Sequence, residues 1–400
     1  MAPAVLKEAL SAAGVPVNVL AVAVPPTVTA AVLAAGRCTA NCPPILRGCL
    51  GRTAGWAYIG FPDAGTRCGR QSEFGAASRL SSDCGELACG DQDLVRHVLF
   101  HRRYQGWTGG HLVHAQYMRI ISQLPGFEVA IYLTPDSHGV DGSPWADFAD
   151  RTLLEWSPEQ ADILFVAGMD WMALPRQSAI EARKPVLNLI QGLGHADSQS
   201  SLFQALDRKA VRICVSEAVA EAVLKTRRCN GPVFTIRNAL APDVSRQQSV
   251  EKTVRVAIVA AKQPVLATQI ADTLRPLGID VDLIEACDRS TFLHRLARSE
   301  IAVFLPFERE GFYLPALEGM GLGCVVVCPD CIGSRSYCRA GVNSIVPEYS
   351  AADIVEATIA AMRIASPARQ SMLAAARDTA DHHSERQIEE RLVPLLNGML

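Results

Sequence analysis

The sequence lacks a strong net charge, because its 38 Lys and Arg residues nearly balance its 41 Asp and Glu residues. The formal charge of −3 and an isoelectric point near 6.3 give no broad attraction for nucleic acid or for anionic lipid. Any phosphate group that this protein binds must therefore be held by a few local groups. We expect no nucleic-acid partner, and a peripheral contact with a membrane stays open.

A convincing export signal or membrane span is also lacking. The stretch 15–36 is apolar, but Pro25 and Pro26 interrupt it. The thirteen cysteines of a chain without an export signal fit a reducing compartment, where thiols stay free and pack as small apolar groups. We therefore expect a cytoplasmic protein without a disulfide framework.

Residues 1–92 lack sustained hydrophobic periodicity and are rich in Ala, Gly, Pro, Ser and Arg, a composition typical of loops or disorder. Six cysteines lie in this stretch: Cys38, Cys42, Cys49, Cys68, Cys84 and Cys89. No C-x-x-C pair occurs among them and no histidine precedes His97, which disfavours a zinc site. We interpret 1–92 as a loop-rich or disordered extension.

From residue 93 onward, short apolar runs alternate with helical patterns, and 49% of the whole chain is apolar. This alternation predicts an α/β protein whose parallel sheets are covered by helices on both faces. In the first half we expect strands at 94–100, 127–133, 163–166, 185–190, 212–215 and 233–236. The expected helices are 112–124, 144–156, 176–182, 201–207 and 217–224, the last with Ser216 as its cap.

A polar stretch at 238–252 suits an interdomain linker, and a second alternating series follows it. Its expected strands are 254–260, 280–285, 301–305 and 324–328, and its expected helices include 267–274, 290–297, 351–362, 367–380 with Ser366 as cap, and 384–396. We divide the chain into the extension 1–92, a first Rossmann-like domain 93–245, a second Rossmann-like domain 246–378, and a C-terminal helical segment 379–400.

The segment 307–347 is the most informative part of the chain. It places Glu310 and Glu318 eight residues apart around a strand-to-helix turn, in which Gly311 allows a tight turn and Pro315 suits the first helical turn. The start of such a helix presents free N–H groups to an anion. Because a second apolar run follows the helix, the ligand should lie beyond the carboxyl ends of the strands.

This segment closely resembles the donor-binding motif of the glycosyl transferases group 1, the retaining family 4 enzymes with the two-domain B-type fold. The matching residues are Glu310, Gly311, Phe312, Leu314, Pro315, Leu317, Glu318, Gly323, Pro329, Asp330, Gly333, Ser334, Arg335, Gly341 and Asn343. The resemblance covers 94–396 and is specific in 301–347. It implies two Rossmann-like domains facing across a cleft, with the acceptor on the first, a nucleotide-sugar on the second, and a final helix that returns to the first domain.

The resemblance also implies roles for the motif residues. Glu318 would accept hydrogen bonds from the two ribose hydroxyls of the donor, and Glu310 would touch the donor sugar and stabilise positive charge on its ring. The amides of Phe312, Tyr313 and Leu314 would face the sugar or its diphosphate. Each acid also has a plainer interpretation: Glu318 could pair with a surface Lys or Arg, and Glu310 could simply cap the helix.

Lys262 follows the strand expected at 254–260, in a loop where the resembled family usually carries both an Arg and a Lys that hold the departing diphosphate. Only Lys262 is evident here, and a solvated loop lysine is the alternative. The second phosphate-binding residue stays unassigned, with Arg237, Arg289 and Arg335 as candidates.

Two further groups of candidates lie in the first half. Gly109 and Gly110 open a helix after the first strand, where small residues let a bound phosphate approach the backbone; a simple tight turn is the alternative. Asp170 and His195 each fall just after a strand, so either could bond the donor sugar or an acceptor hydroxyl, or could be structural. We treat Glu310, His195 and Asp170 as candidate catalytic residues.

We expect no metal site and no cofactor, since the nucleotide-sugar is a substrate. The D-x-D sequence of Asp280 and Asp282 opens a strand instead of ending one, which favours ordinary solvated acids. Cys328 and Cys331 have C-x-x-C spacing, but only Cys338 is near them in the sequence, which disfavours a zinc or redox site.

The function implied by the resemblance is a metal-independent glycosyltransferase of the hexosyltransferase type that retains anomeric configuration. Its acceptor is unidentified and could be a saccharide, a lipid or a small molecule. The missing Arg near Lys262 and the R-N-A-L sequence at 237–240 depart from the family pattern, so a catalytically silent nucleotide-sugar-binding homologue or scaffold remains an alternative. A related enzyme that hydrolyses or epimerises a nucleotide-sugar is a third possibility.

Overall fold

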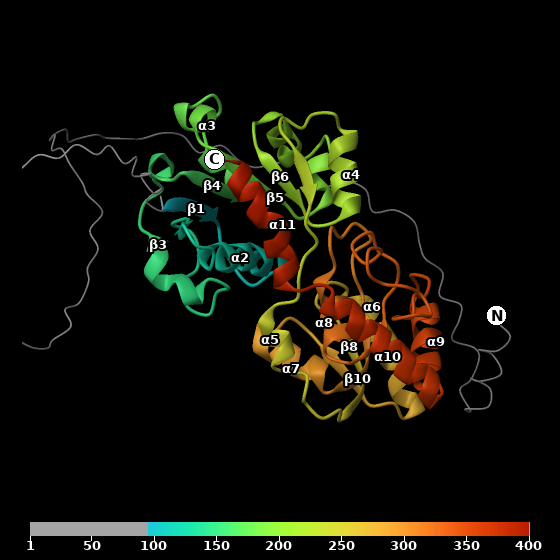
Figure 1. Cartoon of the computed structure of the whole chain (residues 1–400). Helices are drawn as coiled ribbons and strands as arrows, with labels where there is room; N and C mark the ends of the chain where they lie inside the picture. The colour runs from blue at the N-terminus through green and yellow to red at the C-terminus, as the bar shows by residue number, and fades with distance from the viewer. Residues whose placement is uncertain (1–94, 400) are drawn as a thin grey trace, which may run out of the picture. The chain divides into compact units, whose positions relative to one another are not determined.

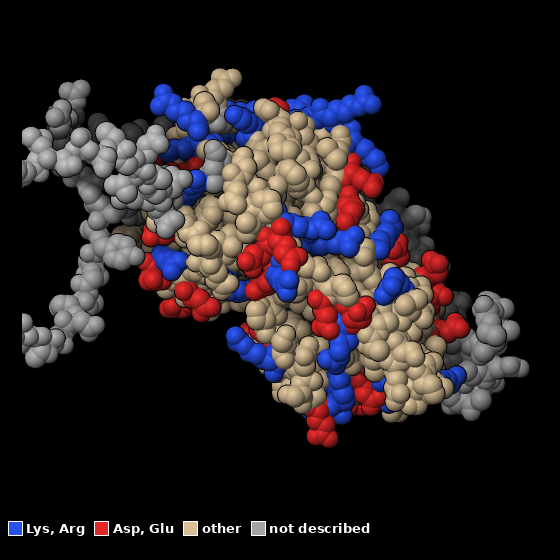
Figure 2. All heavy atoms as spheres, in the orientation of Figure 1, with Lys and Arg blue, Asp and Glu red and all other residues tan. Residues whose placement is uncertain are grey.

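The computed structural model describes residues 95–399, in which strands and helices alternate along the chain (Figure 1). The extension 1–92, its six cysteines and the first residue of the strand expected at 94–100 lie outside the described residues. Within the described part, no helix is long and apolar enough to cross a membrane. On the face shown in Figure 2, acidic and basic side chains are interspersed, in line with the small net charge.

The first sheet has seven parallel strands in the order β3-β2-β1-β4-β5-β6-β7. They are β1 (Arg96–Arg102), β2 (Phe127–Leu133), β3 (Thr152–Leu153), β4 (Ile163–Ala167), β5 (Val186–Ile190), β6 (Val211–Cys214) and β7 (Val233–Thr235). The connections include α2 (Gly109–Ser122), η4 (Gly168–Ala173), α3 (Ala179–Arg183), η5 (Leu193–Ala196), η6 (Ser201–Asp207) and α4 (Glu217–Lys225). Strands β4 and β5 are buried throughout, as expected for a sheet covered on both faces. The prediction that Ser216 caps α4 is confirmed, because its hydroxyl accepts from Val219 N at 3.3 Å.

The helix expected at 144–156 is wrong. The chain instead forms a short 3-10 helix, η2 (Ala146–Arg151), with a non-helical backbone at Phe148, and then the short strand β3. The reason lies in the anchoring of Trp145, which is fully buried against the rings of Tyr104 and His111 and fixes the chain at the start of this segment. The segment 201–207 is likewise a 3-10 helix, not an α-helix.

The second sheet has four parallel strands in the order β11-β10-β8-β9. They are β8 (Val254–Val259), β9 (Val281–Ile284), β10 (Ser299–Phe304) and β11 (Val325–Val327). The helices around it are α6 (Pro264–Leu274), α7 (Arg289–Ala297), α8 (Leu314–Gly321), α9 (Ala351–Met362) and α10 (Ser366–Asp381). The prediction of Ser366 as a cap is wrong by one residue, because Ala365 holds the cap position and Ser366 is already helical.

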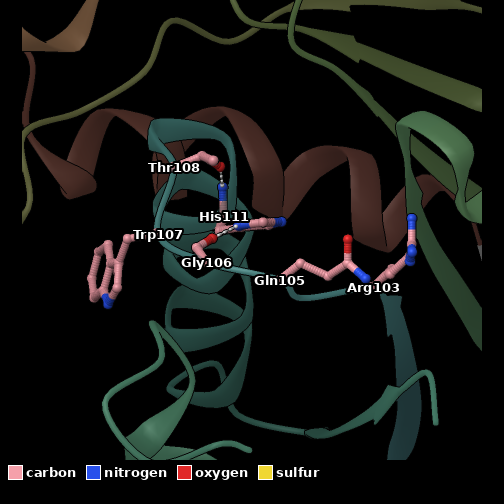
Figure 3. Close-up of a pocket in the computed structure, with 6 residues that line it drawn as sticks. All are labelled: Arg103, Gln105, Gly106, Trp107, Thr108 and His111. Atoms are coloured by element: carbon pink, nitrogen blue, oxygen red, sulfur yellow. Dashed lines mark hydrogen bonds between the residues drawn. The ribbon is translucent and has the colours of Figure 1, made fainter. Parts of the chain in front are cut away.

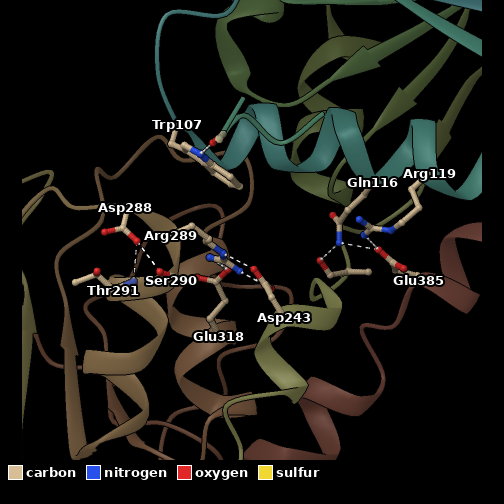
Figure 4. Close-up of polar contacts among 12 residues, drawn as sticks. Trp107, Gln116, Arg119, Asp243, Asp288, Arg289, Ser290, Thr291, Glu318 and Glu385 are labelled. Atoms are coloured by element: carbon tan, nitrogen blue, oxygen red, sulfur yellow. Dashed lines mark hydrogen bonds and ion pairs between the residues drawn. The ribbon is translucent and has the colours of Figure 1, made fainter. Parts of the chain in front are cut away.

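The last helix, α11 (Glu385–Gly398), packs on α2 of the first sheet (Figure 1). Its first residue, Glu385, forms an ion pair with Arg119 and accepts a hydrogen bond from Gln116 at 3.3 Å (Figure 4). The short helix α5 (Pro242–Ser245) lies in the expected linker, and a Cβ at Gly321 of α8 would lie 3.2 Å from its Val244. The two sheets are therefore joined by packed helices as well as by the linker.

The buried guanidinium of Arg212 stabilises the segments at the amino-terminal ends of strands in the first sheet. Its side chain is 0% exposed, and its terminal nitrogens donate to five backbone carbonyls, those of Ala205, Leu206, Arg208, Ala210 and Asn230. Burial lowers the pKa of this guanidinium. The charge is thus solvated by the ends of peptide dipoles from η6 and the turns that flank β6.

Replacing Arg212 should destabilise the protein strongly. In Arg212→Met, five carbonyls lose hydrogen bonds to a charged donor, each worth about 1.5–3 kcal/mol. Part of this loss is offset, because the desolvation cost of a buried charge is also removed. We expect a loss of about 3 kcal/mol or more, which lowers the melting temperature by roughly 6 °C or more in a thermal scan. Arg246→Met, at an exposed position, is the matched control; equal shifts in the two variants would contradict the role given to Arg212.

Candidate functional site

The first sheet changes direction at β1, which lies between β2 and β4, and a cavity of about 190 Å³ opens at this point. Ligands of open α/β sheets bind where the strand order reverses, beyond the carboxyl ends of the strands. The cavity is lined from the ends of β1, β4 and β5 and from the start of α2, by Arg102, Gly110, Gly168, Gln191, Gly192, Gly194, His195 and Leu202. Gly110 and His195 were predicted from the sequence, whereas Arg102 and Gln191 were not.

Asp170 lies next to this cavity, and both of its carboxylate oxygens have hydrogen-bond partners. One carboxylate oxygen contacts His101 Nδ1 at 3.2 Å, and the other accepts from Arg102 at 3.1 Å and from the Ala167 amide at 2.9 Å. Its side chain is buried, so the geometry gives it no free oxygen toward a ligand. What Asp170 does here is hold the Arg102 guanidinium, which also donates to Ala167 O at 2.9 Å.

His195 lines the cavity as a buried, neutral imidazole. Burial and the charge of Arg212 lower its pKa to about 4, although a hydrogen bond with the Gly192 backbone opposes that shift. Its Nε2 atom is buried and has no hydrogen-bond partner. A neutral ring with one nitrogen engaged by the backbone leaves the other available for a hydroxyl.

The second sheet reverses its strand order between β8 and β10, and two predicted residues meet there. Lys262, in the loop after β8, forms an ion pair with Glu310, in the loop after β10. The Lys262 ammonium also lies 5.2 Å from the centre of the Tyr313 ring. The structure therefore brings the predicted phosphate-binding lysine and the predicted sugar-binding acid to one point.

Glu318 has a different environment from the one implied by its motif. Its carboxylate is 2% exposed and accepts from Arg289 at 2.6 Å, and Arg289 also donates to Asp243 at 3.0 and 3.1 Å (Figure 4). Burial raises the pKa of Glu318 against the opposing charge of Arg289. One carboxylate oxygen of Glu318 is therefore occupied by a side chain of the same protein.

The turn between Glu310 and α8 presents fewer amides than expected. Tyr313 N donates to Gly333 O at 3.2 Å, so this amide is not free to face a ligand as expected. A Cβ at Gly333 would lie 2.9 Å from Phe312 N, which shows how closely that loop covers the turn. Among the described residues, the amides of Gly311 and Phe312 have no hydrogen-bond acceptor, and Leu314 is the first residue of α8.

Gly311 is needed for close approach and not for an unusual backbone conformation. Its φ angle lies outside the left-handed region, but a Cβ at this position would lie 2.2 Å from Gln191 O. Ser216 Oγ donates to Gly311 O at 2.8 Å from the same side. The chain turns at 307–310, directly before Gly311, and Gly311 itself makes a direct backbone contact between the loops that follow β5 and β10.

Gln191 joins the predicted segments. Its side-chain amide donates to Gly110 O at 3.0 Å, while its own carbonyl faces Gly311. A Cβ at Gly109 would lie 3.6 Å from Leu314 Cδ1 at the start of α8. Segments that were singled out separately in the sequence, 109–110, 191–195 and 310–314, thus converge where the carboxyl ends of the two sheets face each other. The sequence feature that could have identified Gln191 as a site residue is its position as a polar residue directly after a buried strand.

Other candidates do not join this group. Arg237 pairs with Glu217 at 2.8 Å, and Arg335 pairs with Asp330 at 2.5 Å, both on exposed surface. Asp282 is paired with Arg295. Within the described residues, no group of three or more His, Cys, Asp or Glu side chains is placed to hold a metal ion.

The thiols of Cys328, Cys331 and Cys338 are free. A hydrogen bond with Cys338, together with burial, raises the pKa of the Cys328 thiol, and burial raises that of Cys331. Thiols with raised pKa values are poor nucleophiles and poor metal ligands. Cys328 and Cys331 belong to the buried core, and Cys338 packs against it.

A second hollow, of about 360 Å³, lies in the loop between β1 and α2 (Figure 3). It is lined by Arg103, Gln105, Gly106, Trp107, Thr108 and His111. Thr108 caps α2 by accepting from His111 N at 3.2 Å, and the His111 ring bonds Gly106 O at 2.8 Å. This loop is therefore a fixed part of the first domain's carboxyl edge.

No protein-family model and no curated protein matches the sequence. Among solved structures, HepE from Anabaena, in complex with UDP and glucose, is similar with a TM-score of 0.59 and 14% identity over 76% of this chain and 100% of that chain. A glycosyltransferase from Rickettsia africae has a TM-score of 0.56 and 12% identity over 76% and 98% of the two chains. Sucrose-phosphate synthase from Thermosynechococcus elongatus has a TM-score of 0.54 and 12% identity over 76% and 99%. The chain therefore has the two-domain B-type glycosyltransferase fold, as its sequence predicted.

Enlarging Gly311 should separate the two loops. Gly311→Ala puts a methyl group 2.2 Å from the Gln191 carbonyl, a distance at which backbone must move. We expect a melting temperature several degrees lower, from a cost of about 1–3 kcal/mol. Gly139→Ala is the control, because a Cβ there meets nothing within 4 Å. A Gly311→Ala protein as stable as Gly139→Ala would mean that the contact is easily relieved.

The buried His195 should make stability depend on pH. Because its folded pKa of about 4 lies below the ordinary 6.5, the unfolded chain takes up a proton first as the pH falls. His195 therefore leaves stability intact above pH 6.5 and lowers it between pH 6.5 and 4, by about 2–3 kcal/mol at the low end. Melting temperatures of His195→Asn should fall less steeply over this window than those of the wild type. His138→Asn, at an exposed position, should keep the wild-type slope.

Proposed function

We propose that this protein is a glycosyltransferase that moves a sugar from a nucleotide-sugar donor to an acceptor hydroxyl. The observation that carries the proposal is the meeting of Lys262 and Glu310 at the reversal of the second sheet, opposite Gly109 and Gly110 at the start of α2 and His195 of the first sheet. Structures with this fold and with bound UDP, UDP-glucose or glucose support a nucleotide-sugar as the donor.

Departure of the nucleotide diphosphate needs positive charge near the oxygen that leaves. Lys262 supplies a cation that is about one-third exposed, and the start of α8, with the unpaired amides of Gly311 and Phe312, adds partial positive charge. These groups make the reaction independent of a metal ion in our proposal. Glu310 pairs with Lys262 and would turn to the sugar when the diphosphate takes the ammonium.

We further propose that the transfer retains anomeric configuration. In same-face attack, an oxygen of the departing phosphate takes the proton of the acceptor hydroxyl, so no protein nucleophile is required. The surroundings support this route, because Glu310 is bound to Lys262 and Glu318 is bound to Arg289. Asp170 is likewise engaged by His101 and Arg102.

Glu318 is proposed to bind the donor ribose through the oxygen that Arg289 leaves free. Arg289 contacts only one of the two carboxylate oxygens, and its own bonds to Asp243 keep it in place. Arg289 would then lie against the nucleotide and supply the second cation that the loop of Lys262 lacks.

A second candidate function is a catalytically silent protein that binds a nucleotide-sugar. The observation in its favour is the buried Arg289 pair, which blocks half of the carboxylate expected to bind ribose. The two candidates differ in one measurement: a silent binder responds to a nucleotide-sugar but never releases nucleotide, whatever acceptor is offered.

A panel of UDP-, GDP- and ADP-sugars should identify the donor by thermal shift. A ligand at 100 times its Kd stabilises the fold by about 2.7 kcal/mol, which raises the melting temperature by about 5 °C or more. Lys262→Ala and Glu318→Ala should each weaken donor binding at least tenfold, because each removes a charged partner of the donor.

Lys209→Ala is the matched control, since Lys209 is exposed at the opposite edge of the first sheet, before β6. It should bind the donor as the wild type does. Absence of both a thermal shift and nucleotide release with every sugar of the panel would refute the proposed function. A shift without release over a broad acceptor panel would favour the silent binder.

A further inference from the structure

The cavity at the carboxyl ends of β1, β4 and β5 contains a fixed cation that the proposed donor turn does not use. Arg102 is largely buried, and one of its terminal nitrogens bonds Ala167 O and Asp170. Its Nε atom is buried without a partner. Asp170 is in turn bound by His101 and the Ala167 amide, so the guanidinium is held rigidly, and Arg102 is one of the residues that line the cavity.

The backbone around Arg102 has the composition of an anion site. Four of the eight lining residues are glycines, which let a bound group approach main-chain amides closely. One of them, Gly110, lies in the first turn of α2, a helix of 14 residues whose amino end carries partial positive charge. The volume of about 190 Å³ is several times the roughly 30 Å³ of one water molecule.

His195 adds a hydrogen-bond acceptor to the same cavity. Its Nε2 atom is buried without a partner and the residue is 3% exposed, while the Gly192 backbone engages the ring's other nitrogen. An acceptor nitrogen repels a phosphate oxygen and attracts a hydroxyl. A ligand that satisfies the whole cavity therefore needs an anionic group for Arg102 and a hydroxyl for His195.

We propose that this cavity binds a phosphorylated compound whose carbon skeleton also carries a hydroxyl, such as a sugar monophosphate. The assignment of this ligand as the acceptor of the reaction rests on the proposed function. All of the lining residues belong to the segment 102–202, whereas Lys262 and Glu310 belong to the other sheet. The diphosphate of the donor also carries phosphoryl groups, so it is the other ligand that could supply a phosphoryl group to Arg102. The two sources are separable because a donor diphosphate must compete with UDP and an acceptor phosphate must not.

The test is calorimetric titration of the full chain with glucose 6-phosphate and with inorganic phosphate, each with and without saturating UDP. We expect both to bind the wild type, glucose 6-phosphate more tightly because of its hydroxyls. Arg102→Gln should weaken both at least tenfold. Arg103→Gln, at the next residue, where the side chain is exposed and paired with Asp136 at 2.7 Å, should bind as the wild type does.

Binding that persists in the presence of UDP assigns the cavity to an acceptor phosphate, and competition with UDP assigns it to the donor diphosphate. A second readout requires no variant: glucose 6-phosphate should shift the ring resonances of His195 in wild-type protein labelled at histidine. The proposal is overturned if neither phosphate binds the wild type at millimolar concentration, or if a folded Arg102→Gln protein binds as well as the wild type.

These results separate the cavity from the proposed function. Lys262→Ala should lose UDP binding and keep phosphate binding, because its ammonium belongs to the other sheet. Phosphate binding that depends on Arg102, in a protein that binds no nucleotide-sugar, would uphold the cavity and reject the glycosyltransferase. Binding of a nucleotide-sugar without binding of phosphate would uphold the proposed glycosyltransferase and reject the phosphate-binding cavity.

Discussion

The close backbone approach between Gly311 and Gln191 is the constraint on which the arrangement of the site depends. A Cβ at Gly311 would lie 2.2 Å from the Gln191 carbonyl, so the two loops touch without intervening side-chain atoms. Gln191 also holds Gly110 through its side chain, and Ser216 bonds the Gly311 carbonyl. One contact therefore sets the distance between the start of α2, the end of β5 and the turn before α8, and with it the spacing of every candidate residue.

The topology explains why the candidates gather in two places. Each sheet reverses its strand order once next to its first strand, between β1 and β4 in the first and between β8 and β10 in the second. At these points the connections leave in opposite directions and open a crevice beyond the strand ends. Arg102 and Gly168 lie at the first reversal, and Lys262 and Glu310 lie at the second. The contact between Gly311 and Gln191 brings the two crevices toward each other.

The sequence predicted the fold well because its strands are short apolar runs between clear turn signals. All of the expected strands and most of the expected helices are present in the described residues, with ends that differ by a few residues, although 201–207 is a 3-10 helix. The strand β3 was missed because 144–156 contains helix-forming residues whose conformation is decided by the burial of Trp145. Lys262 and Glu310 could be placed from local patterns. Arg102, Gln191 and Arg289 act through contacts 29 to 81 residues away in the chain, which no local pattern contains.

Three candidate acids each hold a cation: Glu310 holds Lys262, Glu318 holds Arg289, and Asp170 holds Arg102. A phosphate ligand must bind to cations that are already in ion pairs. The solvent exposure of each pair therefore decides which pair can open to bind the phosphate. The pair of Lys262 and Glu310 is the more exposed and should exchange at small cost, whereas opening the buried pair of Arg289 and Glu318 would leave an uncompensated charge in a low-dielectric environment. Arg102 need not leave Asp170 at all, because within the described residues only one of its terminal nitrogens is bonded and the residue lines the cavity. In the proposed function, a diphosphate would therefore bind through Lys262 and a phosphoryl group through Arg102 while the Arg289 pair remains closed.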